Sequence, residues 1–82
     1  MVSKNVIVTC PNGIHARNAS EIVQFAMQCR SELMITVGER RVNPKEIFSL
    51  MAASIKQGDE LILQCSGENE QEDLEKLGKL FL

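Results

Sequence analysis

The sequence predicts an α+β fold in which a four-stranded antiparallel sheet carries three helices on one face, in the order βαββαβα. Three segments alternate apolar and polar residues, two others repeat apolar residues every three or four positions, and no linker or repeat divides the 82 residues. All elements must therefore share one core, and we treat residues 1–82 as a single domain. A ferredoxin-like split βαβ sheet fits the same order and stays open as the alternative.

The first strand and the first helix follow from two patterns. Residues 5–10 alternate, as in a strand with one buried face, and the turn residues Pro11-Asn12-Gly13 end that strand. A helix is expected from Ala16 to about Gln28, because apolar residues recur on one of its faces. The apolar residues of that face are Ala19, Ile22, Val23 and Ala26.

The middle of the chain predicts a hairpin and then a short helix. Residues 32–37 alternate, Gly38-Glu39 suits a tight turn, and residues 40–42 can return as an antiparallel partner. Asn43-Pro44-Lys45-Glu46 is typical of a helix start, since asparagine can cap, proline suits the first helical position, and the glutamate can bond back to the cap. We expect this helix to end near Ile55.

The last strand and the last helix follow a second turn. Gln57-Gly58-Asp59 breaks the chain, and residues 60–66 form a strand. Asn69 and Glu72 repeat the capping pattern at the start of the third helix. The inward stripe of this helix is expected to be Leu74, Leu77, Leu80 and Phe81.

Composition excludes several classes of function. With 9 basic and 11 acidic residues and a net charge of −2, the chain has no clustered basic surface for nucleic acid. Its longest apolar stretch, Ile47–Ile55, is far shorter than the ~20 residues that span a bilayer, and its N-terminus lacks the pattern of a secretion signal. We therefore expect a cytoplasmic protein with no nucleic-acid partner and no membrane insertion.

Cysteine and histidine usage argues against a disulfide or metal framework. Cys10, Cys29 and Cys65 are odd in number and far apart, and the chain has a single histidine. Neither set has the spacing of metal ligands. We expect no metal and no cofactor.

The segment Pro11–Arg17 places the single histidine between the first strand and the first helix. Backbone N–H groups at a helix start have no partner inside the helix, so such an end attracts anions. The helix dipole disfavours a charged imidazole, which leaves His15 a neutral nucleophile, and Arg17 can contact a phosphate once it is attached. From residue types alone, however, a histidine near a turn is more often a capping or exposed residue.

Several features of the sequence, among them the segment Pro11–Arg17, indicate a resemblance to a known family. They are the stretch Asn12–Arg17, the βαββαβα order, Lys45 before the apolar segment Ile47–Met51, and Gln57-Gly58 ahead of the last strand. With them, the chain resembles the histidine-containing phosphocarrier (HPr) family of the bacterial sugar phosphotransferase system over essentially its whole length. The resemblance implies that family's open-faced β-sandwich, with strand order 1-4-2-3.

The resemblance also implies a stoichiometric carrier rather than an enzyme. His15 would accept a phosphoryl group from enzyme I, at the expense of phosphoenolpyruvate, and pass it to the A domains of sugar permeases. Arg17 falls on the family's phosphate-stabilising arginine. The expected binding residues are Asn12, Ala16, Lys45, Ile47, Phe48 and Met51.

The chain departs from the family pattern at position 18, where proline is usual and this sequence has asparagine. Asn18 and Glu21 can form a capping box of their own, which would start the helix about three residues later and weaken phosphate binding at His15. The favoured alternative places the Asn18 side chain in solvent in the first turn, because Ile22 still fixes the helix against the core.

Two further departures concern regulation and docking. Many members carry a serine at position 46, where a kinase acts to block enzyme I docking and recruit a catabolite-control repressor. Glu46 cannot be modified in this way, and we favour a capping role with Asn43 over imitation of a phosphate. Neutral residues replace the family's usual basic ring, so docking is expected to be slow or to involve a divergent enzyme I. These residues are Gln24, Met27 and Ser49.

Ile7, Met34 and Ile62 lie on the outward side of strands that are neighbours in the family's order. They predict an apolar row on the open face, suited to weak self-association or a partner contact. A second hypothesis for the function is a regulatory adaptor on the same fold that acts by docking, with a transcriptional regulator among its partners. Asn18, Glu46 and the depleted basic ring favour it, and the retention of His15 and Arg17 argues against it. A third is an unrelated α+β binding module.

Overall fold

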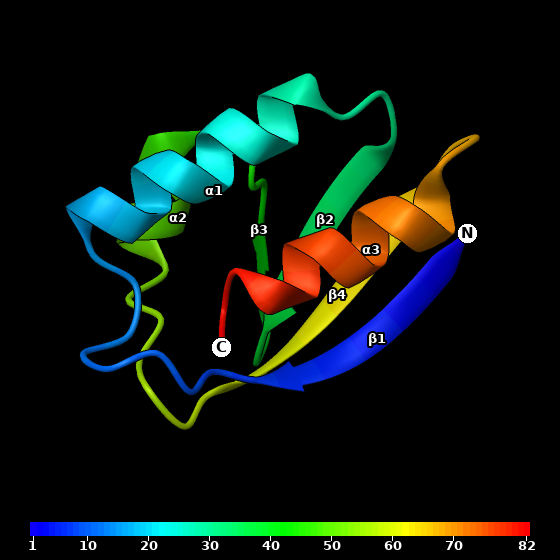
Figure 1. Ribbon diagram of the computed structural model, residues 1–82. Coiled ribbons are helices and arrows are strands. Elements are labelled where there is room, and N and C mark those ends of the chain that lie inside the picture. Colours follow the sequence, from blue (N-terminus) through cyan, green and yellow to red (C-terminus); the bar gives the residue numbers. More distant parts are fainter.

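The computed structural model describes residues 1–82 and contains seven elements in the predicted order. In chain order they are β1 (Val2–Ile7), α1 (Ala16–Gln28), β2 (Glu32–Val37), β3 (Arg40–Val42), α2 (Ile47–Ala52), β4 (Glu60–Ser66) and α3 (Glu70–Lys79). The strands form one antiparallel sheet in the order β1-β4-β2-β3, and Figure 1 shows the helices over one face of it. The predicted fold class and strand order are confirmed, and the ferredoxin-like alternative is wrong.

The core lies between the sheet and the helices and forms one cluster of 17 buried side chains. Inward residues of neighbouring strands stand opposite one another, as Leu61 does with Val6 of β1 and with Val37 of β2. Facing them, the helices and the C-terminal turn bury Ala19, Ile22, Ala26, Leu50, Leu74, Leu77 and Phe81. None of the helices combines the length and apolar character needed to cross a membrane.

The first strand is shifted from its expected place. It runs over Val2–Ile7 rather than residues 5–10, because its pairing is set by β4, from Ile7 opposite Glu60 to Val2 opposite Cys65. Val8 stays buried and exchanges backbone hydrogen bonds with Gly58 and Asp59. After it, the N–H groups of residues 9 and 10 both donate to the carbonyl of residue 81. The alternation of buried and exposed residues therefore continues past Ile7, where the strand pairing of β1 with β4 ends.

The second helix is shorter than expected, because residues 43–46 form a turn. The Asn43 Oδ1 accepts a hydrogen bond from the Lys45 N–H at 2.9 Å, and the Glu46 N–H donates to the Asn43 carbonyl at 3.1 Å. Glu46 is the N-cap residue, and its side chain makes no capping bond. The expected pairing of Glu46 with Asn43 is therefore wrong. At the other end, α2 stops at Ala52, and Ser54 adopts a left-handed φ of 52°.

The third helix begins as expected but without its predicted capping box. Asn69 is the N-cap residue and its side chain makes no capping bond, while Glu72 pairs with Lys76 at 2.9 Å. Acidic residues in the first turn and lysines in the last turn complement the helix dipole instead. In the inward stripe, Leu74, Leu77 and Phe81 are buried and Leu80 is half-buried.

The open face of the sheet carries Ile7, Met34 and Ile62, but not as a straight row. Ile7 and Ile62 are exposed and Met34 is half-buried. Their direct partners across the strands are Asn5 and Thr36 for Ile62, Glu60 for Ile7, and Gln64 for Met34. The three apolar residues therefore form a diagonal that polar neighbours interrupt.

Candidate functional site

The segment that leads to His15 is fastened to the loop that follows α2. Gly13 has a φ of 67°, and a Cβ on it would lie 2.4 Å from the Ile55 carbonyl oxygen and 2.7 Å from the Lys56 Cα. Only glycine fits this close approach without a shift of the backbone. The next residue, Ile14, donates its N–H to the same Ile55 carbonyl at 3.0 Å. The position of His15 thus depends on a segment some forty residues further along the chain.

His15 is the N-cap residue of α1. Its backbone is extended, its carbonyl accepts the Ala19 N–H at 2.8 Å, and the residue is exposed. The N–H groups of residues 16 and 17 belong to the first turn and have no acceptor within the helix, whereas the Asn18 N–H faces the His15 side chain in a capping box. Together with the positive end of the helix dipole, they form an environment that favours an anion beside His15.

Arg17 and Asn12 also reach solvent at this site. Arg17 is exposed in the first turn of α1 and forms no ion pair in the structure. Its guanidinium is free to contact an anion held by the helix start. Asn12 is exposed with a left-handed φ of 67°, so it serves the turn that brings the chain back to Gly13.

Asn18 differs from both expectations for it. The helix begins at Ala16, so the alternative in which Asn18 and Glu21 start it later is wrong. The Asn18 side chain is not in solvent either, because its Oδ1 accepts the His15 N–H at 2.7 Å and its Nδ2 donates to the Gly13 carbonyl at 2.9 Å. The capping partner of Asn18 is thus three residues before it, not after it.

The apolar residues expected to dock partners lie together on α2. Ile47, Phe48 and Met51 are 36%, 86% and 42% exposed, and we call these three residues the α2 patch. Figure 1 shows α2 lying along α1, against which it packs. α2 leads into the loop that contacts Gly13, so its C-terminal end lies toward His15.

Met27 extends the α2 patch across α1. It is 66% exposed. The opposite flank of α1 carries Phe25 and Cys29, which line a cavity of about 240 Å³ together with α3 residues. At 100° per residue, Met27 therefore falls on the flank toward α2. Position 27, where a basic residue is usual, instead enlarges the apolar surface.

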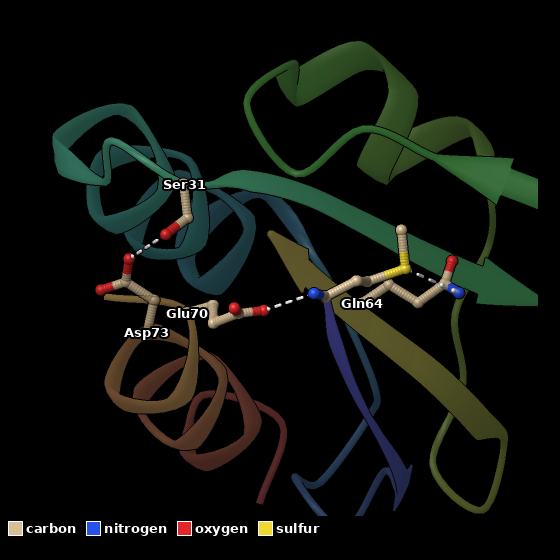
Figure 2. A network of polar contacts seen from close by, with 5 residues as sticks. Ser31, Gln64, Glu70 and Asp73 are labelled. Atoms are coloured by element: carbon tan, nitrogen blue, oxygen red, sulfur yellow. Dashed lines mark hydrogen bonds and ion pairs between the residues drawn. The ribbon is translucent and has the colours of Figure 1, made fainter. Parts of the chain in front are cut away.

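Lys45 lies apart from His15. Its Nζ donates to the Ser31 carbonyl at 3.3 Å, beyond the C-terminal end of α1. α1 has 13 residues, which is about 20 Å of helix. Figure 2 shows that Ser31 is in turn bound to Asp73 of α3, with its hydroxyl donating at 2.7 Å. The structure thus brings Arg17 to the site but not Lys45.

Sequence reasoning missed Arg40, which supports α2. Its Nη1 donates to the carbonyls of Ala52 and Ala53, both at 3.4 Å, at the C-terminal end of that helix. A cation there complements the helix dipole and the unpaired carbonyls. No local pattern indicates this contact, because Arg40 lies 12 and 13 residues before its two acceptors, across the turn that joins β3 to α2.

The three cysteines form no disulfide bond, and burial reduces the access of solvent to Cys29 and Cys65. Burial, with the Asp73 carboxylate nearby, raises the pKa of the Cys29 thiol to about 11. Burial likewise raises the pKa of the Cys65 thiol, which the Ser31 hydrogen bond partly opposes. Neither thiol has the lowered pKa of a reactive cysteine.

Comparison with known proteins agrees with this geometry. The family described as "PTS HPr component phosphorylation site" matches residues 2–82. The chain belongs to the HPr family. A phosphocarrier protein HPr from Haemophilus influenzae is 35% identical over 81 residues, which is 99% of this chain and 95% of that protein. The HPr-like protein Crh from Bacillus subtilis is 39% identical over 77 residues, 94% of this chain and 91% of that protein.

Solved HPr structures have the same architecture. The crystal structure of an HPr from Bacillus anthracis matches with a TM-score of 0.94 and 31% identity, over 99% of this chain and 96% of that one. HPr proteins are phosphocarriers of the phosphotransferase system, not catalytic enzymes. Since the relatives include both HPr and Crh, membership alone does not decide between carriage and regulation.

Proposed function

We propose that the chain is a phosphocarrier that accepts a phosphoryl group on His15 from phospho-enzyme I and passes it to the A domains of sugar permeases. The observation that carries this proposal is the exposed His15 at the N-cap of α1, two residues before an unpaired Arg17. A histidine placed there meets unpartnered N–H groups and a guanidinium within one helical turn. A merely structural histidine needs neither.

In this reaction the chain supplies only a nucleophile and groups that stabilise the added charge. A neutral imidazole nitrogen of His15 attacks phosphorus, a P–N bond forms, and the bond from phosphorus to the donor breaks with its electron pair on the donor. The N–H groups of the first turn, including that of Ala16, and the Arg17 guanidinium stabilise the added negative charge. Transfer to an acceptor reverses these steps, so catalysis comes largely from the partners.

Partners would dock on the α2 patch beside His15. An exposed phenylalanine between exposed aliphatic side chains is typical of the centre of a protein interface. Met27 enlarges this surface and Arg17 supplies a charge near His15, whereas the Lys45 ammonium is engaged with the Ser31 carbonyl beyond the far end of α1. We therefore propose docking that is mainly apolar.

The carrier role is tested by incubation with phosphoenolpyruvate and the same organism's enzyme I, followed by intact mass spectrometry. The expected result is one acid-labile phosphoryl group on the native protein and none on His15→Ala. No uptake by the native protein, with that enzyme I proven active on another carrier, would contradict the relay.

The docking role is tested with Phe48→Ala. It is expected to lower kcat/KM for phosphoryl uptake by about tenfold, as for a central interface residue. Ile62→Ala is the matched control, because Ile62 is also exposed but lies on the open face of the sheet, away from the helices. Equal rates for the two variants would remove the α2 patch from the interface.

A regulatory adaptor is the second candidate function. It is favoured by Glu46, which is exposed at the N-cap of α2 and holds no capping bond, and the HPr-like protein Crh is among the relatives. Such an adaptor would dock a transcriptional regulator, and the diagonal of Ile7, Met34 and Ile62 would support weak self-association. A monomeric sedimentation profile at high concentration would contradict self-association, and phosphoryl uptake with transfer to a permease domain would favour the carrier.

A further inference from the structure

Asn18 holds the backbone on both sides of the proposed phosphorylation site. Its carbonyl oxygen accepts from His15 N–H at 2.7 Å and its amide group donates to the Gly13 carbonyl at 2.9 Å. An asparagine has one acceptor and two donors, so only this orientation satisfies a backbone donor and a backbone acceptor together. The side chain is half-buried, which reduces the competition from water for the bond to Gly13, whereas the bond from the His15 N–H is exposed.

These two hydrogen bonds of Asn18, which we call the Asn18 bridge, link the turn before His15 to α1. The turn before His15 also contacts the loop after α2. Gly13 lies close to Ile55 and Lys56, and the Ile14 N–H donates to the Ile55 carbonyl. Those contacts place the turn against the loop after α2, and none of them is made to a residue of α1. The Asn18 amide supplies that second fixed point.

We propose that Asn18 is a positioning residue for phosphoryl transfer, a role that rests on the proposed function of His15. By holding the His15 backbone extended, with φ −132° and ψ −178°, it fixes where the imidazole stands relative to the N–H groups of the first turn. Asn18 acts through His15 and needs no contact with the phosphoryl group. Because its amide is neutral, it achieves this without placing a negative charge beside the phosphate.

Three variants separate this role from a general effect on the helix. Asn18→Ala removes both hydrogen bonds. Asn18→Asp keeps an acceptor for the His15 N–H but loses the donor to Gly13 and adds a negative charge. Glu21→Ala is the matched control, since Glu21 is exposed on the same helix and makes no bond to the turn.

The first measurement needs no phosphorylation. Hydrogen exchange of the His15 amide, followed by NMR and normalised to the Ile22 and Ala26 amides in the middle of α1, reports the bridge directly. Asn18→Ala is expected to speed this exchange about fivefold, the value for one lost hydrogen bond. Asn18→Asp and Glu21→Ala are expected to leave it near the native rate. A native exchange rate in Asn18→Ala would overturn the proposal.

The second measurement loads His15 without enzyme I. Phosphoramidate breaks its P–N bond, releases ammonia and forms a new P–N bond on the imidazole, and the lifetime of the product is followed by intact mass. Asn18→Ala is expected to lose the group about fivefold faster than the native protein, and Asn18→Asp at least as fast although its His15 amide stays protected. Equal lifetimes for native protein and Asn18→Ala would overturn the positioning role.

The two proposals can fail separately. A native protein that is loaded by phosphoramidate but not by enzyme I has no place in the relay, and the lifetimes then still decide the role of Asn18. Loading by enzyme I with equal lifetimes in the native protein and Asn18→Ala would keep the carrier and remove the positioning residue.

Discussion

Replacement of Gly13 by alanine tests how far the site depends on the loop after α2. The new Cβ would lie 2.4 Å from the Ile55 carbonyl oxygen and 2.7 Å from the Lys56 Cα, both of them backbone atoms that cannot swing away. The residue would also keep a φ of 67°, which costs an L-residue roughly 1–2 kcal/mol. If the loop moves to make room, the Ile14 to Ile55 hydrogen bond is lost as well, at about 1 kcal/mol.

These contributions predict a loss of about 2–3 kcal/mol in the free energy of unfolding. Gly38→Ala is the matched control, because Gly38 has a similar φ of 61° but nothing lies within 4 Å of the position that its Cβ would take. It should lose only the backbone strain, about 1–2 kcal/mol. The difference between the two variants therefore isolates the close approach at Gly13.

Urea unfolding of both variants measures this difference, and thermal unfolding checks it, since 1 kcal/mol shifts Tm by about 4–8 °C in a domain of this size. Phosphohistidine lifetime after loading with phosphoramidate measures the effect on the site, and it should shorten in Gly13→Ala but not in Gly38→Ala. Equal losses of stability in the two variants, with native lifetimes in both, would refute the dependence of His15 on the loop after α2.

Three other predictions concern stability, docking and pH. Gly78→Ala should raise the free energy of unfolding by about 0.5–1 kcal/mol in urea, because Gly78 is in a helix and its Cβ would meet Val6 at an ordinary 3.6 Å; a loss of stability would show that the space is too small. Phosphoryl uptake from enzyme I should change by less than about threefold between low and high salt, since the exposed side chains of the α2 patch and Met27 are apolar and the charges at the two ends of α2, Glu46 and Arg40, are opposite in sign; a steep salt dependence of kcat/KM would contradict apolar docking. The free energy of unfolding should fall as pH rises from about 9 to about 11, because the Cys29 thiol has its pKa raised from 9.0 to about 11 in the folded protein and ionises first when unfolded. Cys29→Ser should flatten that fall, and equal slopes for the two proteins would refute it.

Element order and inward faces were predictable because each depends on periodicity within a segment. Alternation over residues 32–37 and 60–66 identified β2 and β4 within their observed bounds, and the apolar face of residues 16–28 identified α1. Strand order and the role of His15 came instead from a family resemblance. Periodicity alone does not say which strands pair.

Element ends were harder to predict, because they depend on partners outside the segment. β1 is three residues early, since β4 determines where its ladder begins and ends. α2 begins late because the Asn43 side chain bonds the N–H two residues on, which competes with a helix cap. In each of these two segments the residues are compatible with the predicted bounds as well as the observed ones. Contacts with other parts of the chain decide which bounds are adopted.

The site shows the same competition at the point where function depends on it. Asn18 followed by Glu21 has the pattern of a forward capping box, yet the asparagine bonds backward to His15 and Gly13. The backward bonds prevail because Gly13 is held in place by Ile55 and Lys56, so a carbonyl acceptor stands ready where the side chain points. The hydrogen-bond partners of Asn18 thus depend on residues about forty positions further along the chain. The departure from the usual proline does not displace His15 from the helix start; it replaces a ring constraint by two hydrogen bonds that hold the same end of the helix.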